Sequence, residues 1–344
     1  MTPAGALLAA EIRRDGPVSF RRFMDAALYH PDHGYYRRPR DPFGKSGDFF
    51  TAGQLQPVFG ILVAARVRQL CEQMGRPKDF TVVELGPGRG EMAEAFSEWP
   101  YVPVDVDSGA LPEHFCGVVF SNEFFDALPV EAAVYERGTF RERLVTLRDG
   151  RFAWETGGVC RPEVEQYLRR YFPPPEEGRI YEANLEALRW MERIARSLES
   201  GYVLAIDYGF TREEAVRFPA GTLMGYRRHT AREDVLEQPG ERDITAHVNF
   251  TALQECAAAH GLRTERFETL ARLLLTAGEP DQFAAALGPP GAADELKRRM
   301  QLKTLLFGMG ETFIVLLLFL SHFAEARPLG SGCLPNAVEG GGEP

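Results

Sequence analysis

The sequence predicts an α/β fold built on a doubly wound, mostly parallel sheet, and three observations support this prediction. First, short apolar runs typical of buried parallel strands recur at 80–85, 101–107, 117–125 and 201–210. Second, the run at 80–85 leads directly into a glycine-rich turn. Third, a last apolar run at 313–323 is shorter than the roughly 20 residues of a bilayer span, so it predicts a buried strand, antiparallel to the others.

The composition indicates a globular protein and argues against several classes of partner. The chain has 344 residues, 44% of them hydrophobic, and a net charge of −10, whereas nucleic-acid-binding proteins usually carry a basic surface. Its five cysteines form no CxxC pair and its seven histidines show no metal-ligand spacing, which predicts reduced thiols and no metal site. We therefore expect a cytoplasmic protein of a bacterium, without a targeting segment, a nucleic-acid partner or a membrane span.

Residues 1–78 predict a helical N-terminal region. Apolar residues at helical spacing indicate helices at 7–16 and 19–30. The segment 30–50 is rich in glycine, proline and aromatic residues without either period, so it predicts a long loop. A third helix is predicted from Thr51 to Met74, because Thr51 and Gln54 form a capping box and apolar residues follow on one face.

The rest of the chain predicts a core of 79–130 and 200–320 with an insertion between its halves. In the core we expect a helix at about 90–96 after the glycine turn, a helix at 251–260 and smaller helices to about 307. The insertion, 131–199, begins with short strands separated by the turns "ERGT" and "RDGR", which predict an antiparallel meander, and continues with two helices. We expect it to contact a substrate or partner, and we expect a disordered tail at 327–344.

The glycine turn predicts a nucleotide-like ligand. Glycines let the backbone approach a ligand, but Gly86, Gly88 and Gly90 follow a G-x-G-x-G pattern, which differs from the dinucleotide pattern G-x-G-x-x-G. S-adenosylmethionine fits better, because its cationic groups favour a nearby carboxylate and Glu84 supplies one. Asp105, which follows the next strand, would bind the ribose hydroxyls; the alternative is a solvated turn residue.

A second set of polar residues follows the strand at 117–125. Asn122, Glu123 and Asp126 lie at the carboxyl edge of the predicted sheet, where open α/β sheets place their chemistry. Methyl transfer is an in-line displacement, so a site must mainly align the acceptor and take its proton. The alternative is that these side chains, Asp126 above all, only cap the following turn.

Several longer motifs resemble the MidA family of S-adenosylmethionine-dependent methyltransferases. They are "FRRFMDAALYHPDHGYY", "GDFFTAGQLQPVFG", "VVELGPGRG", "SNEFFDALPV", "IDYG", "GTLMGYRRHT", "DITAHVNF" and "FGMGETF". The resemblance runs from about residue 6 to 318. The resemblance implies a class I, Rossmann-like methyltransferase fold. It also implies a protein arginine as acceptor, because the mitochondrial members methylate an arginine of a respiratory complex I subunit during assembly.

The resemblance also implies roles for individual residues. It assigns cofactor binding to Glu84, Gly86, Pro87, Gly88, Gly90, Asp105, Asp48 and Thr51. It assigns Asn122 and Glu123 to the methyl-donor side, which makes them catalytic candidates together with Asp126, and it leaves the roles of His229, Asp243 and His247 open. Thr51 has the alternative of only capping its helix.

The chain departs from the family pattern in several places, which keeps other functions open. Ala52, Gly53 and Gln54 replace the usual residues after Thr51, and Asn249 replaces a commoner aspartate. A non-catalytic assembly or scaffold protein that keeps the fold is therefore the main alternative, an NAD-dependent oxidoreductase is a weaker one, and a homodimer is left open.

One strand of the usual sheet is expected to be absent. Only ten residues, 107–116, separate the strand ending near Val106 from the next one, whereas parallel strands usually need crossovers of a dozen or more. We predict that the third strand is missing, that the Asp105 strand forms the sheet edge, and that Phe49 or Phe50 partly replaces the missing wall of the adenine pocket.

Overall fold

The computed structural model describes residues 1–37, 55–106, 108–227, 230–232 and 234–321. In these residues the main sheet has six strands in the order β15-β16-β9-β4-β2-β3. Their bounds are β2 Thr81–Leu85, β3 Tyr101–Val104, β4 Phe115–Asn122, β9 Leu198–Asp207, β15 Arg263–Thr269 and β16 Ile314–Leu320. Neighbouring strands from β3 to β9 pair in parallel, and β16 runs antiparallel to both β9 and β15. The predicted mostly parallel sheet with an antiparallel last strand is confirmed.

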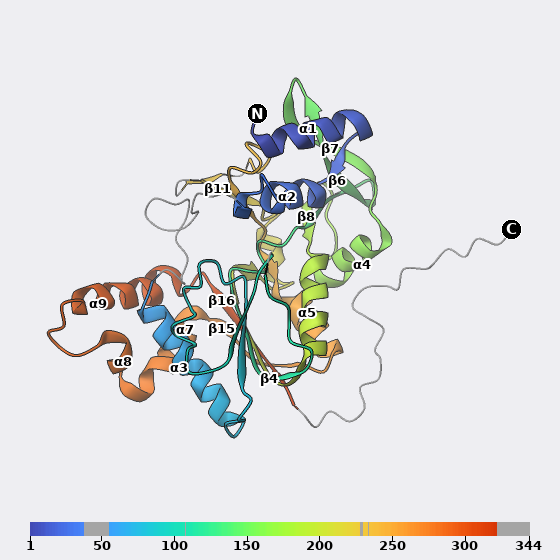
Figure 1. Ribbon diagram of the computed structural model, residues 1–344. Helices are drawn as coiled ribbons and strands as arrows, with labels where there is room; N and C mark the ends of the chain where they lie inside the picture. Colours follow the sequence, from blue (N-terminus) through green and yellow to red (C-terminus); the bar gives the residue numbers. More distant parts are fainter. Residues whose placement is uncertain (38–54, 107, 228–229, 233, 322–344) are drawn as a thin grey trace.

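Helices cover both faces of this sheet (Figure 1). On one face α3, Val58–Gln73, and α7, Leu270–Gly278, pack over alternate strand residues such as Val82 and Phe120. On the other face lie α5, Leu185–Ser197, and α6, Phe250–Ala259. Because both faces are buried, the strands are nearly continuous apolar runs, which is why the sequence revealed them.

The prediction of a missing third strand is confirmed for the described residues. β3 forms the edge of the sheet, and between β3 and β4 the chain makes only a single bridge from Asp105 to Ser108. Ten extended residues can cover about 33 Å, whereas ten helical residues would cover about 15 Å. The short connection therefore crosses β2 without a helix, and Leu111 packs against the core on the way.

The helix predicted at about 90–96 is wrong. The segment after the glycine turn forms successive turns, with backbone bonds such as Gly90 N–H to the Pro87 carbonyl (2.8 Å) and Ala93 N–H to the Gly90 carbonyl (3.1 Å). Gly88 and Gly90 have φ of +57° and +76°, outside the right-handed helical region.

The start predicted for the third helix also needs correction. Residues 55–57 form a bend and a turn, and α3 begins only at Val58. Pro57 explains this, because a proline disfavours helical conformation in the residue before it and is tolerated at a helix start. Thr51 and Gln54 lie outside the described residues.

A second, antiparallel sheet joins the insertion to the N-terminal region (Figure 1). The predicted meander is confirmed as β5 Glu131–Glu136, β6 Thr139–Arg148 and β7 Arg151–Val159. β8, Ile180–Ala183, pairs with β5, and β1, Val18–Ser19, pairs with β6.

The predicted helices α1, Pro3–Asp15, and α2, Phe20–Tyr29, are also present and bury Phe20 and Phe23 against this sheet. The N-terminal region and the meander therefore share a core, while α5 from the insertion packs on β9 of the main sheet. The proposed domain boundaries stay a prediction.

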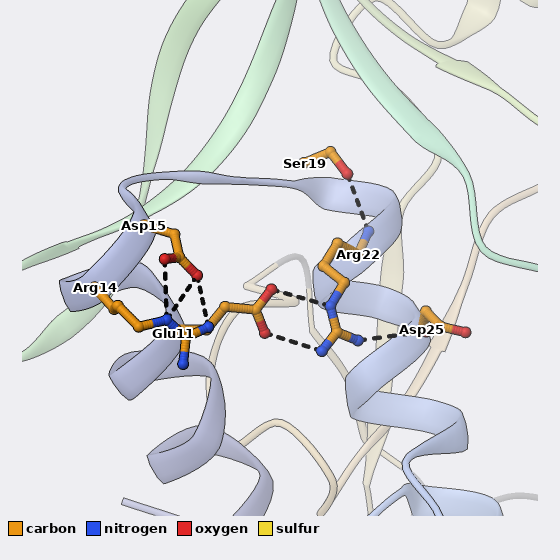
Figure 2. A network of polar contacts seen from close by, with 6 residues as sticks. All are labelled: Glu11, Arg14, Asp15, Ser19, Arg22 and Asp25. Atoms are coloured by element: carbon orange, nitrogen blue, oxygen red, sulfur yellow. Dashed lines mark hydrogen bonds and ion pairs between the residues drawn. The ribbon is translucent and has the colours of Figure 1, made fainter.

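Arg22 joins the first two helices (Figure 2). Its guanidinium donates to both carboxylate oxygens of Glu11 on α1, at 3.1 and 2.9 Å, and lies 3.5 Å from Asp25 on its own helix. The Ser19 hydroxyl caps α2 by accepting from the Arg22 N–H at 3.1 Å. These contacts are exposed, so they orient the helices more than they stabilise them.

The remaining elements are short. They are η1 Tyr35–Arg37, α4 Pro162–Tyr171, β10 Gly209–Phe210, η3 Glu214–Arg217, β11 Met224–Arg227, β12 Thr230–Arg232, β13 Asp243–Thr245, β14 Val248–Asn249, η4 Glu279–Asp281, α8 Ala284–Leu287, α9 Glu295–Lys303 and the π-helix η5 Thr304–Met309. None of the helices in the described part of the chain is long and apolar enough to cross a membrane. The predicted tail at 327–344 lies outside the described residues.

Two asparagines cap the helices that cover one face of the main sheet. The Asn184 side chain accepts from the Ala187 N–H (2.9 Å) at the start of α5 and donates to the Phe125 carbonyl (3.0 Å). Asn249 does the same at α6, with the Ala252 N–H (3.1 Å) and the Tyr171 carbonyl (2.9 Å). An aspartate could cap either helix but could not donate to the carbonyl. Asn249 therefore has a structural role. The sequence alone showed only that it replaces a charged aspartate of the family pattern.

We predict that Asn249→Asp destabilises the fold. The cap remains, but the Tyr171 carbonyl loses its donor and faces a carboxylate, so the free energy of unfolding should fall by about 1–3 kcal/mol. Urea denaturation measures this change. Asn249→Ala is the control, because it also loses the cap and should be at least as unstable; wild-type stability for Asn249→Asp would contradict the assigned bond.

Candidate active site

The carboxyl ends of β2, β4 and β9 meet at one edge of the sheet, and the glycine turn begins there. Gly86 follows β2 and donates its N–H to the Val104 carbonyl of β3 at 2.9 Å. Gly86, Gly88 and Gly90 all have positive φ, between +57° and +76°. Side chains are disfavoured in this region, so glycine keeps the turn open to a ligand.

The loop after β4 packs directly on this turn. A Cβ on Gly86 would lie 3.1 Å from the Phe124 ring, so the two sequence motifs touch. Phe124 also contacts Trp190 of α5 edge to face, with centroids 5.2 Å apart. The structure thus brings together the two groups of residues that the sequence singled out, from segments almost 40 positions apart in the chain.

Glu84 is buried beneath the turn, with 4% of its surface exposed. The Tyr101 hydroxyl donates to its carboxylate at 2.5 Å. Burial raises the pKa of Glu84 to about 7, and the Tyr101 bond opposes this shift only in part; Glu91 and Asp105 also raise the pKa. A contact of this carboxylate with a bound ligand stays a prediction.

Asp105 lies in a tight turn at the end of β3. Its carboxylate accepts from the Val106 N–H at 2.7 Å, and its own N–H donates to the Ser108 carbonyl at 2.8 Å. The side chain is partly exposed at the sheet edge, beside the glycine turn. This position fits a residue that contacts the ribose and equally fits a residue of a solvated turn, so both interpretations remain.

Asp207 organises the loop after β4. It ends β9, is completely buried, and accepts with one carboxylate oxygen from the backbone N–H groups of Phe124 (3.2 Å), Phe125 (2.9 Å) and Asp126 (3.4 Å). Its other oxygen accepts from the Tyr208 N–H at 2.9 Å. Burial and the nearby Glu123 raise the pKa of Asp207 to about 8, although these N–H groups favour the charged form.

Glu123 has a strained backbone at the entrance to this loop. Its φ is +53°, a left-handed conformation that costs a non-glycine residue about 1 kcal/mol, and its N–H is fixed to the Ile206 carbonyl at 2.9 Å. The Asn122 amide donates to the Glu123 carboxylate at 3.1 Å. Among the residues that the structure describes, none donates a hydrogen bond to the buried amide oxygen of Asn122. Such strain is typical of functional sites, where neighbouring contacts hold it.

Two further carboxylates complete what we call the acidic cluster, Glu123, Asp126, Asp207 and Asp243. Asp126 and Asp243 are 4% and 3% exposed, whereas Glu123 is only partly buried. Burial raises the pKa of Asp126 well above its usual value, and the charges of Asp207 and Asp243 raise it further. N–H groups of the same turn favour the charged form of Asp126, as expected of a capping residue. Both proposed roles of Asp126 therefore remain compatible with its position.

Tyrosines surround the acidic cluster. The Tyr36 hydroxyl donates to the Asp243 carboxylate at 2.8 Å, and the Tyr29 hydroxyl donates to the Ala127 carbonyl at 2.9 Å. Tyr208 and Tyr226 lie close enough to the cluster for its charges to raise their pKa values, after the effect of burial. The acids and tyrosines come from α2, η1, β4, β9, β11 and β13, so the site is assembled from distant parts of the chain.

The remaining predicted residues lie elsewhere or outside the described part of the chain. The His247 N–H donates to the Thr222 hydroxyl at 3.0 Å, its ring packs against Phe218, and burial lowers its pKa, so the ring is neutral at pH 7. Asp48, Thr51 and His229, and the stacking proposed for Phe49 or Phe50, lie outside the described residues. No group of three or more possible metal ligands occurs within the described ranges.

Sequence reasoning missed Asp207 and the tyrosines as site residues. Asp207 stands in the motif "IDYG" at the end of a buried strand, which was a usable signal because chemistry gathers at this edge. Tyr29 and Tyr36 carried no such signal, since only the pairing of β1 with β6 and the packing of α2 bring them near β4.

The residues at the turn fit S-adenosylmethionine. The three glycines leave backbone uncovered between Glu84 and Asp105, and the turn lies against the loop that holds Glu123. Backbone polar groups at the glycines could hydrogen-bond the methionine end of the cofactor, and Asp105 could bind its ribose. The carboxylates would favour its sulfonium cation. When bound, this group supplies a methyl group activated by a sulfonium. The residues named would hold it at the carboxyl edge of the sheet.

We predict that the unfolding free energy falls as pH rises from about 4 to about 8. Glu84 and Glu182 have pKa values raised to about 7, and Asp207 to about 8, against about 4 in an unfolded chain. The folded state therefore binds more protons in this window, and stability decreases as pH rises, by about 1.4 kcal/mol per pH unit for each carboxyl that is protonated only in the folded state. Urea denaturation at several pH values measures the slope. Glu84→Gln should flatten it; an unchanged slope would show that Glu84 is charged throughout.

Comparison with known proteins agrees with the geometry. Residues 97–268 match a family model described as "Putative S-adenosyl-L-methionine-dependent methyltransferase". A structure from Burkholderia thailandensis, described as a "likely methyl transferase" and bound to S-adenosyl-homocysteine, is 30% identical, with a TM-score of 0.83 over 92% of this chain and 91% of that one. A Drosophila melanogaster relative named "Protein arginine methyltransferase NDUFAF7 homolog, mitochondrial" is 29% identical over 74% of this chain and 70% of its own length. The chain belongs to the MidA family of S-adenosylmethionine-dependent methyltransferases.

Proposed function

We propose that this methyltransferase transfers its methyl group to an arginine side chain of a protein. The acidic cluster beside the glycine turn is the observation that carries this proposal. An arginine guanidinium is permanently protonated and presents several N–H donors in a plane. A site that attracts it needs several acceptors and negative charge, and the cluster offers both.

The raised pKa of Asp126 supports a cationic acceptor. Burial is the largest cause of this shift, and the charges of two other carboxylates, Asp207 and Asp243, add to it, so the free site gathers carboxyl groups at a cost in free energy. A guanidinium placed among them would lower these pKa values and release that cost. A neutral acceptor, such as a hydroxyl, would bring no positive charge to offset this cost.

We assign contact with the acceptor to Glu123. It is the partly exposed member of the cluster, whereas Asp126, Asp207 and Asp243 are buried behind it. Its carboxylate would hold the guanidinium and take the proton that leaves the attacking nitrogen as the new N–C bond forms. Asn122 would orient Glu123, and Asp207 would act as a positioning residue through the backbone of the loop.

The family resemblance supports a finer proposal about the partner. Relatives from mitochondria carry the name protein arginine methyltransferase. We propose a respiratory complex subunit as the protein acceptor of this chain as well. Incubation of the purified chain with labelled cofactor and a respiratory-membrane extract, followed by mass spectrometry of labelled peptides, identifies the acceptor and would equally reveal an unrelated one.

We predict that Glu123→Gln lowers methyl transfer to an arginine-containing peptide by about 100-fold or more while cofactor binding persists. An assay with a labelled methyl group measures the transfer, and calorimetry measures cofactor binding. Glu113→Gln is the matched control, because Glu113 is exposed at the opposite end of β4 and should leave both unchanged. Full turnover in Glu123→Gln would contradict the role of Glu123. A partner captured by both forms without methylated product would favour the scaffold alternative.

We also predict that Glu84→Gln weakens S-adenosylmethionine binding by about tenfold or more, because a buried carboxylate facing a cation is lost. In the wild type, affinity should rise with pH through about 7 as Glu84 loses its proton, and the variant should lack this rise. Calorimetric titrations at several pH values test both statements. Tyr101→Phe removes only the hydrogen bond and should have the smaller effect; equal affinities in all three proteins would exclude Glu84 from the ligand site.

A further inference from the structure

The helical segment α9–η5, residues 295–309, exposes large apolar side chains. Leu296 is 74% exposed, Met300 53% and Phe307 80%. Single exposed apolar residues are ordinary, but a phenylalanine with most of its surface in water is not. Leu296 and Met300 are four positions apart and share one side of α9, and Phe307 follows on η5. We call these three residues the apolar stripe.

The opposite side of the same segment faces the protein. Leu305 is fully buried against the core beneath α3 and α7, and Gln301 is 8% exposed and donates to the Gln56 carbonyl at 2.6 Å. The segment is therefore anchored from one side, and the apolar stripe points away from the core. In Figure 1, α9 lies at the outer end of the helices that cover this face of the sheet.

Basic residues flank the apolar stripe, although the chain as a whole has a net charge of −10. Lys297 lies on one side of it, and Arg299 and Lys303 lie on the other, given 100° of rotation per residue. All three are exposed, and the only acid within 295–309, Glu295, is paired with Arg299 at 2.9 Å. Two of the four lysines of the chain are therefore gathered in this short segment.

We propose that the apolar stripe and its basic flanks bind the surface of an anionic lipid bilayer. A helix that lies in the bilayer interface needs apolar residues on one side, with lysines and arginines at the level of the headgroups. This is the arrangement on α9 and η5. The charge of the rest of the chain opposes such binding, so the local basic flanks decide which face meets the membrane.

A second copy of the chain fits this surface less well. Two copies related by a twofold axis would place the same basic flanks against each other around the apolar stripe, and like charges at a contact oppose association. A bilayer that carries anionic headgroups instead complements all three basic residues at once. Bound in this way, the segment would hold the methyltransferase core at a membrane surface through the Gln301 anchor.

The test uses the full chain and sedimented vesicles of phosphatidylcholine, with or without about one third phosphatidylglycerol. We expect binding to the anionic vesicles only, and a loss of binding as salt rises from about 50 to 500 mM. Phe307→Ser and Leu296→Ser should each weaken binding by about tenfold. Leu7→Ser is the matched control, because Leu7 is 45% exposed on α1, outside the apolar stripe, and should bind as the wild type does.

Charge reversal tests the basic flanks separately. Lys297→Glu and Lys303→Glu should each weaken binding by about fivefold or more, whereas Lys78→Glu, an exposed lysine just before β2, should not. Thermal unfolding and S-adenosylmethionine binding of every variant should match the wild type. Absence of binding to anionic vesicles, or binding that survives Phe307→Ser, would overturn the proposal. A dimer in solution that Phe307→Ser dissociates, without vesicle binding, would show that a second copy covers the apolar stripe.

Discussion

The site depends on one buried carboxylate, that of Asp207. It ends β9, and its oxygens accept the backbone N–H groups of the loop after β4 and of the next residue in its own chain segment. These bonds hold Glu123 in a left-handed conformation at the entrance of the acidic cluster and keep Phe124 on the glycine turn. Because unsatisfied N–H groups and a buried unpaired carboxylate would both cost several kcal/mol, the two segments stabilise each other.

The same arrangement gathers acidic side chains there, at a cost to their charged forms. Asp126 and Asp207 have raised pKa values because burial disfavours their charged forms, and hydrogen bonds from backbone N–H groups offset only part of that effect. Charging the carboxyl groups of the free site therefore costs free energy, as expected of a site that binds a cation. The tyrosines around it add hydroxyl groups without adding charge at neutral pH, and Asn184 anchors the Phe125 carbonyl from α5.

Much of the fold could be predicted because both faces of the main sheet are buried. Strands of that kind are apolar throughout, so β2, β4, β9 and β16 stand out in the sequence, and the short connection 107–116 indicated the missing third strand. The prediction of a helix after Gly90 was wrong, because local composition does not show that Gly88 and Gly90 have positive φ. β15 was missed because most of its residues are exposed and polar. The proposed cytoplasmic location, homodimer and domain boundaries stay predictions.

The sequence alone determined the chemistry of the carboxyl edge: glycines that admit a ligand, Glu84 and Asp105 on neighbouring strands, and Glu123 after a third. These residues are local to strand ends, and the topology of a parallel sheet brings strand ends together whatever the rest of the chain does. Only the tertiary structure decided that Asp207 orders the loop and that Tyr29, Tyr36 and Asp243 join the site. Those contacts link residues up to 207 positions apart, as Tyr36 and Asp243 are, and depend on how the N-terminal helices pack on the second sheet, which no local pattern encodes.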